Sequence, residues 1–185
     1  MINEKETTRS PAVKTPHLTT AVLLLAILAG GAFLTWWTVA WTDRVMRTDL
    51  LLQTQSVAQT VDVNRVQTLS GTKADLTRPE YLQLKEQFAV LHSANPKYRF
   101  IYLMGRKPNG KVFFFVDSES SDSKDCSHPG QVYEEASDDL RRMFDTKTQL
   151  LEGPLTDDWG VWVSALVPMI DTKTGALVAV LLKYS

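Results

Sequence analysis

The hydrophobic positions of the chain follow three successive patterns. An apolar run without any charged residue covers residues 18–42. Apolar residues then recur at near-helical spacing in residues 43–69 and again in residues 81–91. From residue 98 onward the period changes to two, which is typical of β-strands. This order predicts a membrane helix, then two further helices, and then a sheet.

The uncharged run is long enough to cross a membrane as a helix. About 20 helical residues span the hydrocarbon core of a bilayer, and residues 18–42 exceed that length. Trp36, Trp37 and Trp41 gather near its C-terminal end. Because amphipathic rings favour the headgroup layer, this position is typical of a membrane interface. The run therefore predicts a transmembrane helix.

Lysine and arginine set the expected orientation. They are slightly more frequent before the run than directly after it, and the side richer in these residues stays in the cytoplasm. We expect residues 1–17 to be a cytoplasmic tail, residues 18–42 a single pass through the inner (cytoplasmic) membrane, and residues 43–185 an extracytoplasmic domain. The alternative is a cleaved signal peptide with small residues at 29–31, although signal cores are usually only about 7–15 residues long.

Two helices are expected after the membrane. Residues 43–69 contain no Gly or Pro, which predicts one long helix. Thr77 and Glu80 have the spacing of a capping box, and Pro79 is tolerated in a first turn. We therefore expect the second helix to begin at Thr77 and to stop at the Asn-Pro pair at 95–96.

The remaining pattern predicts strands and one short helix. YRFIYLMG (98–105) and KVFFFVD (111–117) flank the turn sequence KPNG, which indicates a hairpin. Ser137 is the expected cap of a short helix with acidic residues in its first turn. Residues 153–170 and 176–184 read as two further strands joined by DTKTG. The fold class is α+β with a mainly antiparallel sheet.

Composition excludes several classes of protein. The chain has 185 residues, 44% of them hydrophobic, which suits one globular domain with an attachment. The net charge of −1 gives no reason to expect a nucleic-acid partner, because phosphate binding needs a clustered basic surface. Cys126 is the single cysteine, so no intrachain disulfide can form. No cofactor is expected, since the sequence has no nucleotide-binding Gly motif.

Several segments resemble the extracytoplasmic Cache (PAS-like) sensor domain of bacterial transmembrane receptors. They are YLMGRKPNGKVFFFVDSE, GQVYEEAS and EGPLTDDWGVWVSALVPMIDTKTGALVAVL, and VDVNRVQTLSGTKADLTRPEYLQLKEQF is similar to the N-terminal helical part of that domain. The resemblance covers roughly residues 43–182. It implies a long helix on one face of a five-stranded antiparallel sheet, with a loop-covered small-molecule pocket on the other face.

The resemblance also implies a function. The receptors concerned are sensor histidine kinases or diguanylate cyclases, so the chain is expected to be a membrane-anchored small-molecule sensor, truncated before an output domain. No enzymatic activity is expected, because no phosphoacceptor-histidine region or cyclase signature is present. The expected partners are a small-molecule ligand, the membrane, and a second copy of the chain or a receptor. The alternative is a ligand-independent dimerisation or interaction module that modulates a full-length receptor.

Strand alternation predicts which residues line the pocket. We place aromatic residues of the first two strands on the same side as the polar and aromatic positions of residues 153–170, which gives an aromatic cavity with polar tips. The alternative is that the rings belong to the core and satisfy their polar atoms locally. The expected ligand-binding residues are Tyr102, Met104, Phe115, Asp117, Tyr133, Trp159, Trp162 and Ser164.

Two sets of acidic residues have alternative interpretations. Asp117 either accepts hydrogen bonds from a ligand amine or caps the turn after its strand, and the sequence favours neither. Asp157 and Asp158 either bind a cationic group or form a solvated turn, and the turn is the favoured interpretation.

Metal binding and nucleophilic catalysis find little support. Asp125, Cys126 and His128 form a potential metal cluster, but ligands so close together in one loop rarely build a tetrahedral site without a distant partner. No metal is therefore expected. Ser164 lies in the middle of a strand without a base nearby in the sequence, so we expect no catalytic residues.

Overall fold

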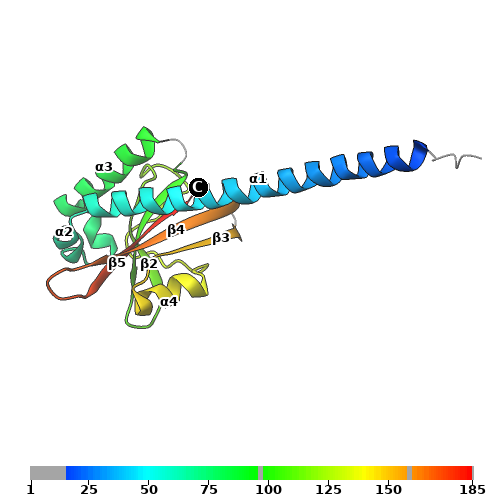
Figure 1. Ribbon diagram of the computed structural model, residues 1–185. Coiled ribbons are helices and arrows are strands. Elements are labelled where there is room, and N and C mark those ends of the chain that lie inside the picture. Colours follow the sequence, from blue (N-terminus) through cyan, green and yellow to red (C-terminus); the bar gives the residue numbers. More distant parts are fainter. Residues whose placement is uncertain (1–15, 96–97, 158–159, 185) are drawn as a thin grey trace, which may run out of the picture. The chain divides into compact units, whose positions relative to one another are not determined.

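The computed structural model describes residues 16–95, 98–157 and 160–184 (Figure 1). The chain divides into two compact units, Met1–Arg44 and Val45–Ser185. Helix α1, Pro16–Thr60, contributes to both units. Each unit is described separately below.

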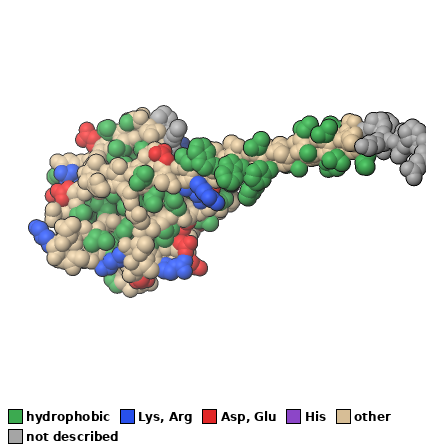
Figure 2. Space-filling view, in the orientation of Figure 1, with side chains coloured by type: hydrophobic (Ala, Val, Ile, Leu, Met, Phe, Trp, Pro, Cys, Tyr) green, Lys and Arg blue, Asp and Glu red, His purple; other side chains and the backbone are tan. Residues whose placement is uncertain are grey.

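The first unit contains the apolar half of α1. Its large hydrophobic side chains are exposed, with exposed fractions of 57% for Leu24 and 70% for Leu28, and hydrophobic side chains recur along its visible face (Figure 2). Within the described residues, α1 is the one helix whose length and composition would allow it to cross a membrane. Such a surface is stable in lipid but unfavourable in water.

The helices of the second unit begin and end at recognisable caps. The long helix expected over residues 43–69 ends early, at Thr60, because Asp62 accepts a hydrogen bond from the Asn64 amide and starts a separate helix α2, Val63–Gln67. The capping box expected at Thr77 and Glu80 was also misplaced. It is formed instead by Thr72 and Asp75 at the start of η1, Lys73–Thr77.

The next helix, α3, begins two residues later than the expected start at Thr77. It covers Pro79–Ala94, with Pro79 in the first turn and Arg78 at the N-cap without a side-chain capping bond. The last helix, α4, covers Asp138–Thr146. Its cap is the predicted Ser137, whose hydroxyl oxygen accepts a hydrogen bond from the Leu140 amide at 2.9 Å.

The sheet has five antiparallel strands in the order β2-β1-β5-β4-β3. The strands are β1 Phe100–Arg106, β2 Val112–Asp117, β3 Leu150–Asp157, β4 Gly160–Ile170 and β5 Leu177–Tyr184. The α+β class and the five-stranded sheet under a long N-terminal helix are therefore confirmed. The single strand expected over residues 153–170 is wrong, because that stretch is divided between the second half of β3 and the whole of β4.

Two hydrophobic clusters cover the two faces of the sheet. On one face α3 and the second half of α1 pack on the sheet through Val57, Leu84 and Phe88. On the opposite face α4 packs through Leu140 and Met143 (Figure 1). Each face thus has its own core, and the pocket expected on the loop-covered face lies on the α4 side.

A β-bulge changes the face of several residues. The register between β1 and β2 shifts between Leu103 and Met104, so that Met104 pairs with Phe114. Because side chains alternate along a strand, a shift of one residue moves the following positions to the other face. The prediction that Phe115 shares a face with Met104 is therefore wrong, whereas Asp117 pairs with Tyr102 at the end of β2. Phe115 packs against the α1 and α3 cluster, and Asp117 contacts Lys85 on α3.

Candidate functional site

Five aromatic rings form a continuous chain on the α4 face. Each ring contacts the next at a centroid distance of 5.0 to 5.9 Å. The order is Trp162, Phe100, Tyr102, Phe114 and Tyr133. The central rings are buried, with exposed fractions of 8% or less, whereas the rings at the two ends are half-buried. The chain is therefore core in its middle and surface at its ends.

The two terminal rings line the same cavity, which has a volume of about 260 Å³. The segment before α4 provides one wall, and β3 and β4 provide the other. The lining residues are Tyr133, Glu135, Ser137, Glu152, Leu155, Thr156 and Trp162. The cavity is slightly smaller than the roughly 300–1,000 Å³ of sites for drug-sized ligands, so its volume suits a smaller molecule.

The most unusual lining residue is Glu152, which the sequence analysis did not select. It is 9% exposed, and one of its carboxylate oxygens accepts a hydrogen bond from the Ser137 hydroxyl at 2.6 Å. Burial raises the pKa of Glu152, and the bond from Ser137 opposes that rise. Ser137 thus caps α4 and also holds the buried carboxyl group, which links the helix to β3.

A bulge in β3 places Glu152 at the cavity. The register of β3 against β4 shifts between Glu152 and Leu155, with Gly153 and Pro154 in the shifted stretch. Gly153 has φ of 109°, and a Cβ there would lie 2.4 Å from the Trp162 carbonyl oxygen. Only glycine permits this approach. The sequence signal for the site was the Glu-Gly-Pro triplet, at which the sequence analysis placed the beginning of a strand.

Several of the predicted pocket residues lie at this cavity or close to it. Tyr133 and Trp162 line the cavity, while Tyr102 and Met104 lie in the cluster beneath it. Ser164 is 1% exposed and pairs with Glu152 across the sheet.

The other predicted residues lie elsewhere. Phe115 is on the opposite face, and Asp117 contacts Lys85 on α3, as described above. Trp159 lies outside the described residues, as does Asp158. Asp157 ends β3. The solvated turn predicted for Asp157 and Asp158 stays a prediction.

Asp117 is occupied by contacts within the chain. It is fully buried, forms an ion pair with Lys85, and accepts a hydrogen bond from the Ser127 amide at 2.5 Å. The Cys126 thiol lies 3.7 Å from Asp117 and 3.7 Å from the Lys85 ammonium group. Burial, followed by the charge of Asp117, raises the pKa of Cys126. These contacts give Asp117 a structural role in fixing the loop that follows β2.

Comparisons with known proteins identify the fold. No protein-family model and no curated protein matches the chain. Among solved structures, the chain is similar to the ligand-binding domain of the Campylobacter jejuni chemoreceptor Tlp3 in complex with L-valine, with 10% sequence identity and a TM-score of 0.50. The sensory domain of the same receptor with isoleucine bound matches with 10% identity and a TM-score of 0.49.

The match to the L-valine complex covers 92% of this chain and 64% of the chemoreceptor domain. At this identity the likeness establishes the fold alone. The chain therefore shares the architecture of a chemoreceptor sensor domain, and its function has to be argued from its own site.

Proposed function

We propose that the protein is a membrane-anchored sensor domain that binds a small molecule carrying an ammonium group in the cavity on the α4 face. The observation that carries this proposal is the buried Glu152 carboxyl group between the rings of Tyr133 and Trp162. A cationic ligand would stabilise the ionised form of Glu152, which burial otherwise disfavours.

The rest of the lining is complementary to a cation. Glu135 adds a second carboxylate, and no lysine or arginine is among the described lining residues. Tyr133 and Trp162 present aromatic rings, whose faces attract cations by about 0.5–2 kcal/mol. Thr156 and Ser137 contribute hydroxyl groups that can orient the ligand.

The fold supports a sensor, and the lining narrows its ligand class. The chemoreceptor domain with the same architecture binds L-valine, whose ammonium group is the chemistry that this cavity would recognise. The carboxylate of an amino acid would also need cationic or amide donors. The described lining supplies hydroxyl groups and the indole N–H of Trp162 but no cationic side chain, so a simple amine fits the cavity better than an amino acid does.

Helix α1 is the element that would transmit a ligand-dependent conformational change. This helix continues without interruption from the apolar segment into the second unit, where Leu50 and Val57 are buried. A ligand shifts a conformational equilibrium only through different affinities for two states. We propose that residues 18–42 anchor the chain in the inner membrane, with the sensor domain outside the cytoplasm, and that α1 passes the change to a second copy or to a receptor output domain.

The proposal is tested by thermal unfolding of the full chain in a nonionic detergent. The ligand panel pairs small primary amines and amino acids with carboxylic acids of the same carbon skeleton that lack the amine. A ligand at 100 times its Kd stabilises the folded state by about 2.7 kcal/mol, which raises the Tm by several degrees. We expect amines to raise the Tm and their amine-free counterparts to leave it unchanged.

The variant Glu152→Gln keeps the acceptor for Ser137 but removes the charge. We expect it to weaken amine binding at least about tenfold, because truncating a buried charged partner costs about 2 kcal/mol or more. Glu86→Gln on the exposed face of α3 is the matched control and should bind as the wild type does. The proposal fails if no amine raises the Tm, or if the two variants bind equally.

A further inference from the structure

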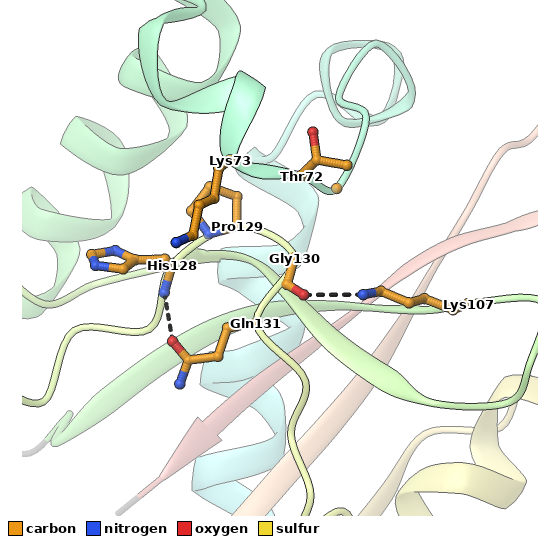
Figure 3. Close-up of a pocket in the computed structure, with 8 residues that line it drawn as sticks. Thr72, Lys73, Lys107, His128, Pro129, Gly130 and Gln131 are labelled. Carbon is orange, nitrogen blue, oxygen red and sulfur yellow. Dashed lines mark hydrogen bonds between the residues drawn. The ribbon is translucent and has the colours of Figure 1, made fainter.

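A second cavity lies beyond the edge of β2. It is separate from the cavity on the α4 face that contains Glu152, which we name the amine cavity. Its volume is about 450 Å³, and it is formed by the turn before η1, the residue after β1, and the loop before the Phe113–Val132 bridge (Figure 3). The lining residues are Gly71, Thr72, Lys73, Lys107, His128, Pro129, Gly130 and Gln131. We name this cavity the cationic groove.

Two lysine ammonium groups and a histidine ring line the groove. Lys73, Lys107 and His128 all line it, and none of its described lining residues is Asp or Glu. In Figure 3 the Lys73 side chain points toward His128 and Pro129, while Lys107 extends toward Gly130 from the other side. The charge of the groove is thus opposite to that of the amine cavity.

Each polar side chain retains donors for a ligand. The Lys107 ammonium group donates to the Gly130 carbonyl oxygen at 3.1 Å, which leaves two further N–H groups. The side-chain oxygen of Gln131 (Oε1) accepts a hydrogen bond from the backbone amide of His128 at 3.1 Å. The NH₂ group of the same side chain can therefore donate to a ligand. Lys73 is exposed at the rim. Donors from three separate segments therefore surround the groove.

The backbone holds the groove in shape. The Gly130 amide donates to the Phe114 carbonyl at 2.8 Å, and the Phe114 amide donates to the Gln131 carbonyl at 3.0 Å. A Cβ on Gly130 would lie 2.6 Å from the Gly71 carbonyl oxygen, so the two turns touch. Upstream, the bond from Ser127 to Asp117 fixes the same loop. A site that is already ordered loses less entropy when a ligand binds.

The nearest acidic group is committed to the fold. Asp75 is fully buried and accepts hydrogen bonds from the Ser70 amide at 3.0 Å and the Gly71 amide at 2.8 Å. Its charge is therefore offset by backbone dipoles, and it does not line the groove. The lysines and His128 determine the potential that a ligand meets.

From this arrangement we propose that the cationic groove is a binding site for a small soluble anion bearing phosphoryl or carboxyl groups. Ammonium groups and amide donors that converge on a concave site form short, charge-assisted hydrogen bonds with such oxygens. The volume of the groove exceeds that of a single phosphate, so it suits an organic phosphate or a polycarboxylate. The site is separate from the proposed amine cavity, because the lining residues of the two do not overlap.

The test is isothermal titration of the detergent-solubilised full chain with inorganic phosphate, pyrophosphate and citrate at constant ionic strength. The detergent is nonionic, so no lipid phosphate competes. We expect saturable binding of at least one probe. Preference for pyrophosphate would identify phosphoryl recognition, and preference for citrate would identify carboxylate recognition.

Two groove variants and one control make the test decisive. Lys73→Gln and Lys107→Gln should each weaken binding about tenfold, as expected for the loss of one charge-assisted hydrogen bond. Lys173→Gln removes the same charge from an exposed position in the β4–β5 turn and should bind as the wild type does. The proposal is overturned if the wild type binds none of the probes saturably, or if Lys73→Gln and Lys173→Gln bind equally. Neither result bears on amine binding.

Discussion

The carboxyl group of Glu152 lies where burial opposes its charge. Burial is the main cause that raises its pKa, so the folded chain holds this proton more tightly than the unfolded chain does. Stability falls with rising pH wherever the folded state binds more protons. The contribution of Glu152 to stability is therefore largest below the ordinary glutamate pKa of about 4.3. It is lost as pH rises through the raised folded-state value.

This sign gives a prediction for Glu152→Gln. The free energy of unfolding of the wild type minus that of the variant should decrease as pH rises above about 4 and level off once Glu152 is ionised in the folded state. Urea unfolding at a series of pH values measures both curves. Taking the difference removes the contributions of all other titrating groups. A flat difference for Glu152→Gln would contradict the assignment.

Single residues of the site were only partly predictable from the sequence. Trp162 was placed at the pocket by strand alternation and Tyr133 by the loop expected to cover the pocket, and both line the cavity. Phe115 was placed on the wrong face because a bulge leaves no mark in an alternating pattern. Asp117 was assigned to the pocket because the sequence does not show its ion pair with Lys85 on α3. Glu152 was missed because nothing in a single sequence shows that a carboxylate next to Gly-Pro will be buried.

At the scale of elements, strand β3 depends on Gly153. Replacing it with alanine would put a Cβ 2.4 Å from the Trp162 carbonyl oxygen at φ of 109°. We expect Gly153→Ala to lower the free energy of unfolding by at least about 2 kcal/mol, from backbone strain together with the clash. Because the clash lies between β3 and β4, the cavity between Glu152 and Trp162 should change as well.

The control for this prediction is Gly175→Ala. Gly175 also has positive φ, at 67°, but a Cβ there would meet no atom within 4 Å. It should therefore cost only about 1 kcal/mol, the strain of a left-handed conformation. Denaturant unfolding compares the two variants. Equal losses would show that the close approach at Gly153 contributes nothing, and would contradict the role given to the bulge.

Elements with strong periodicity were predicted well, and those fixed by tertiary contacts were not. The β1–β2 hairpin, α4 with its Ser137 cap, and β4 and β5 follow from alternation and turn residues. The end of α1 at Thr60 depends on a local cap at Asp62 that competes with continued helix. Strand β3 forms because β4 offers an edge for pairing, which outweighs the poor strand propensity of Gly and Pro.

At the scale of the whole domain, one segment joins the two proposed sites. Residues 128–131 line the cationic groove, and Tyr133, Glu135 and Ser137 line the amine cavity. Between them Val132 forms a bridge with Phe113, and hydrogen bonds from Phe114 and Tyr133 fix the segment to β2. A ligand that orders one end of this segment therefore restricts the other end. If both sites bind, their occupancies should be coupled.

Coupling between sites must be reciprocal. If the anion changes the affinity for the amine by some factor, the amine changes the affinity for the anion by the same factor. In known cases this factor is typically about 5 to 150. We expect the anion to strengthen amine binding, because it would restrict the remaining motion of the segment that also lines the amine cavity and leave less entropy to be lost there. Titrations of the amine with and without saturating anion, and the reverse pair, measure both factors.

The variant Lys73→Gln separates this coupling from direct competition or general stabilisation. Lys73 lines the groove and does not line the amine cavity, so the variant should bind the amine normally in buffer without the anion. It should then show no change in amine affinity when the anion is added. If the wild type binds both ligands but neither ligand changes the affinity for the other, the sites are independent. The segment 128–137 would then act only as a shared wall, with opposite charge on its two sides.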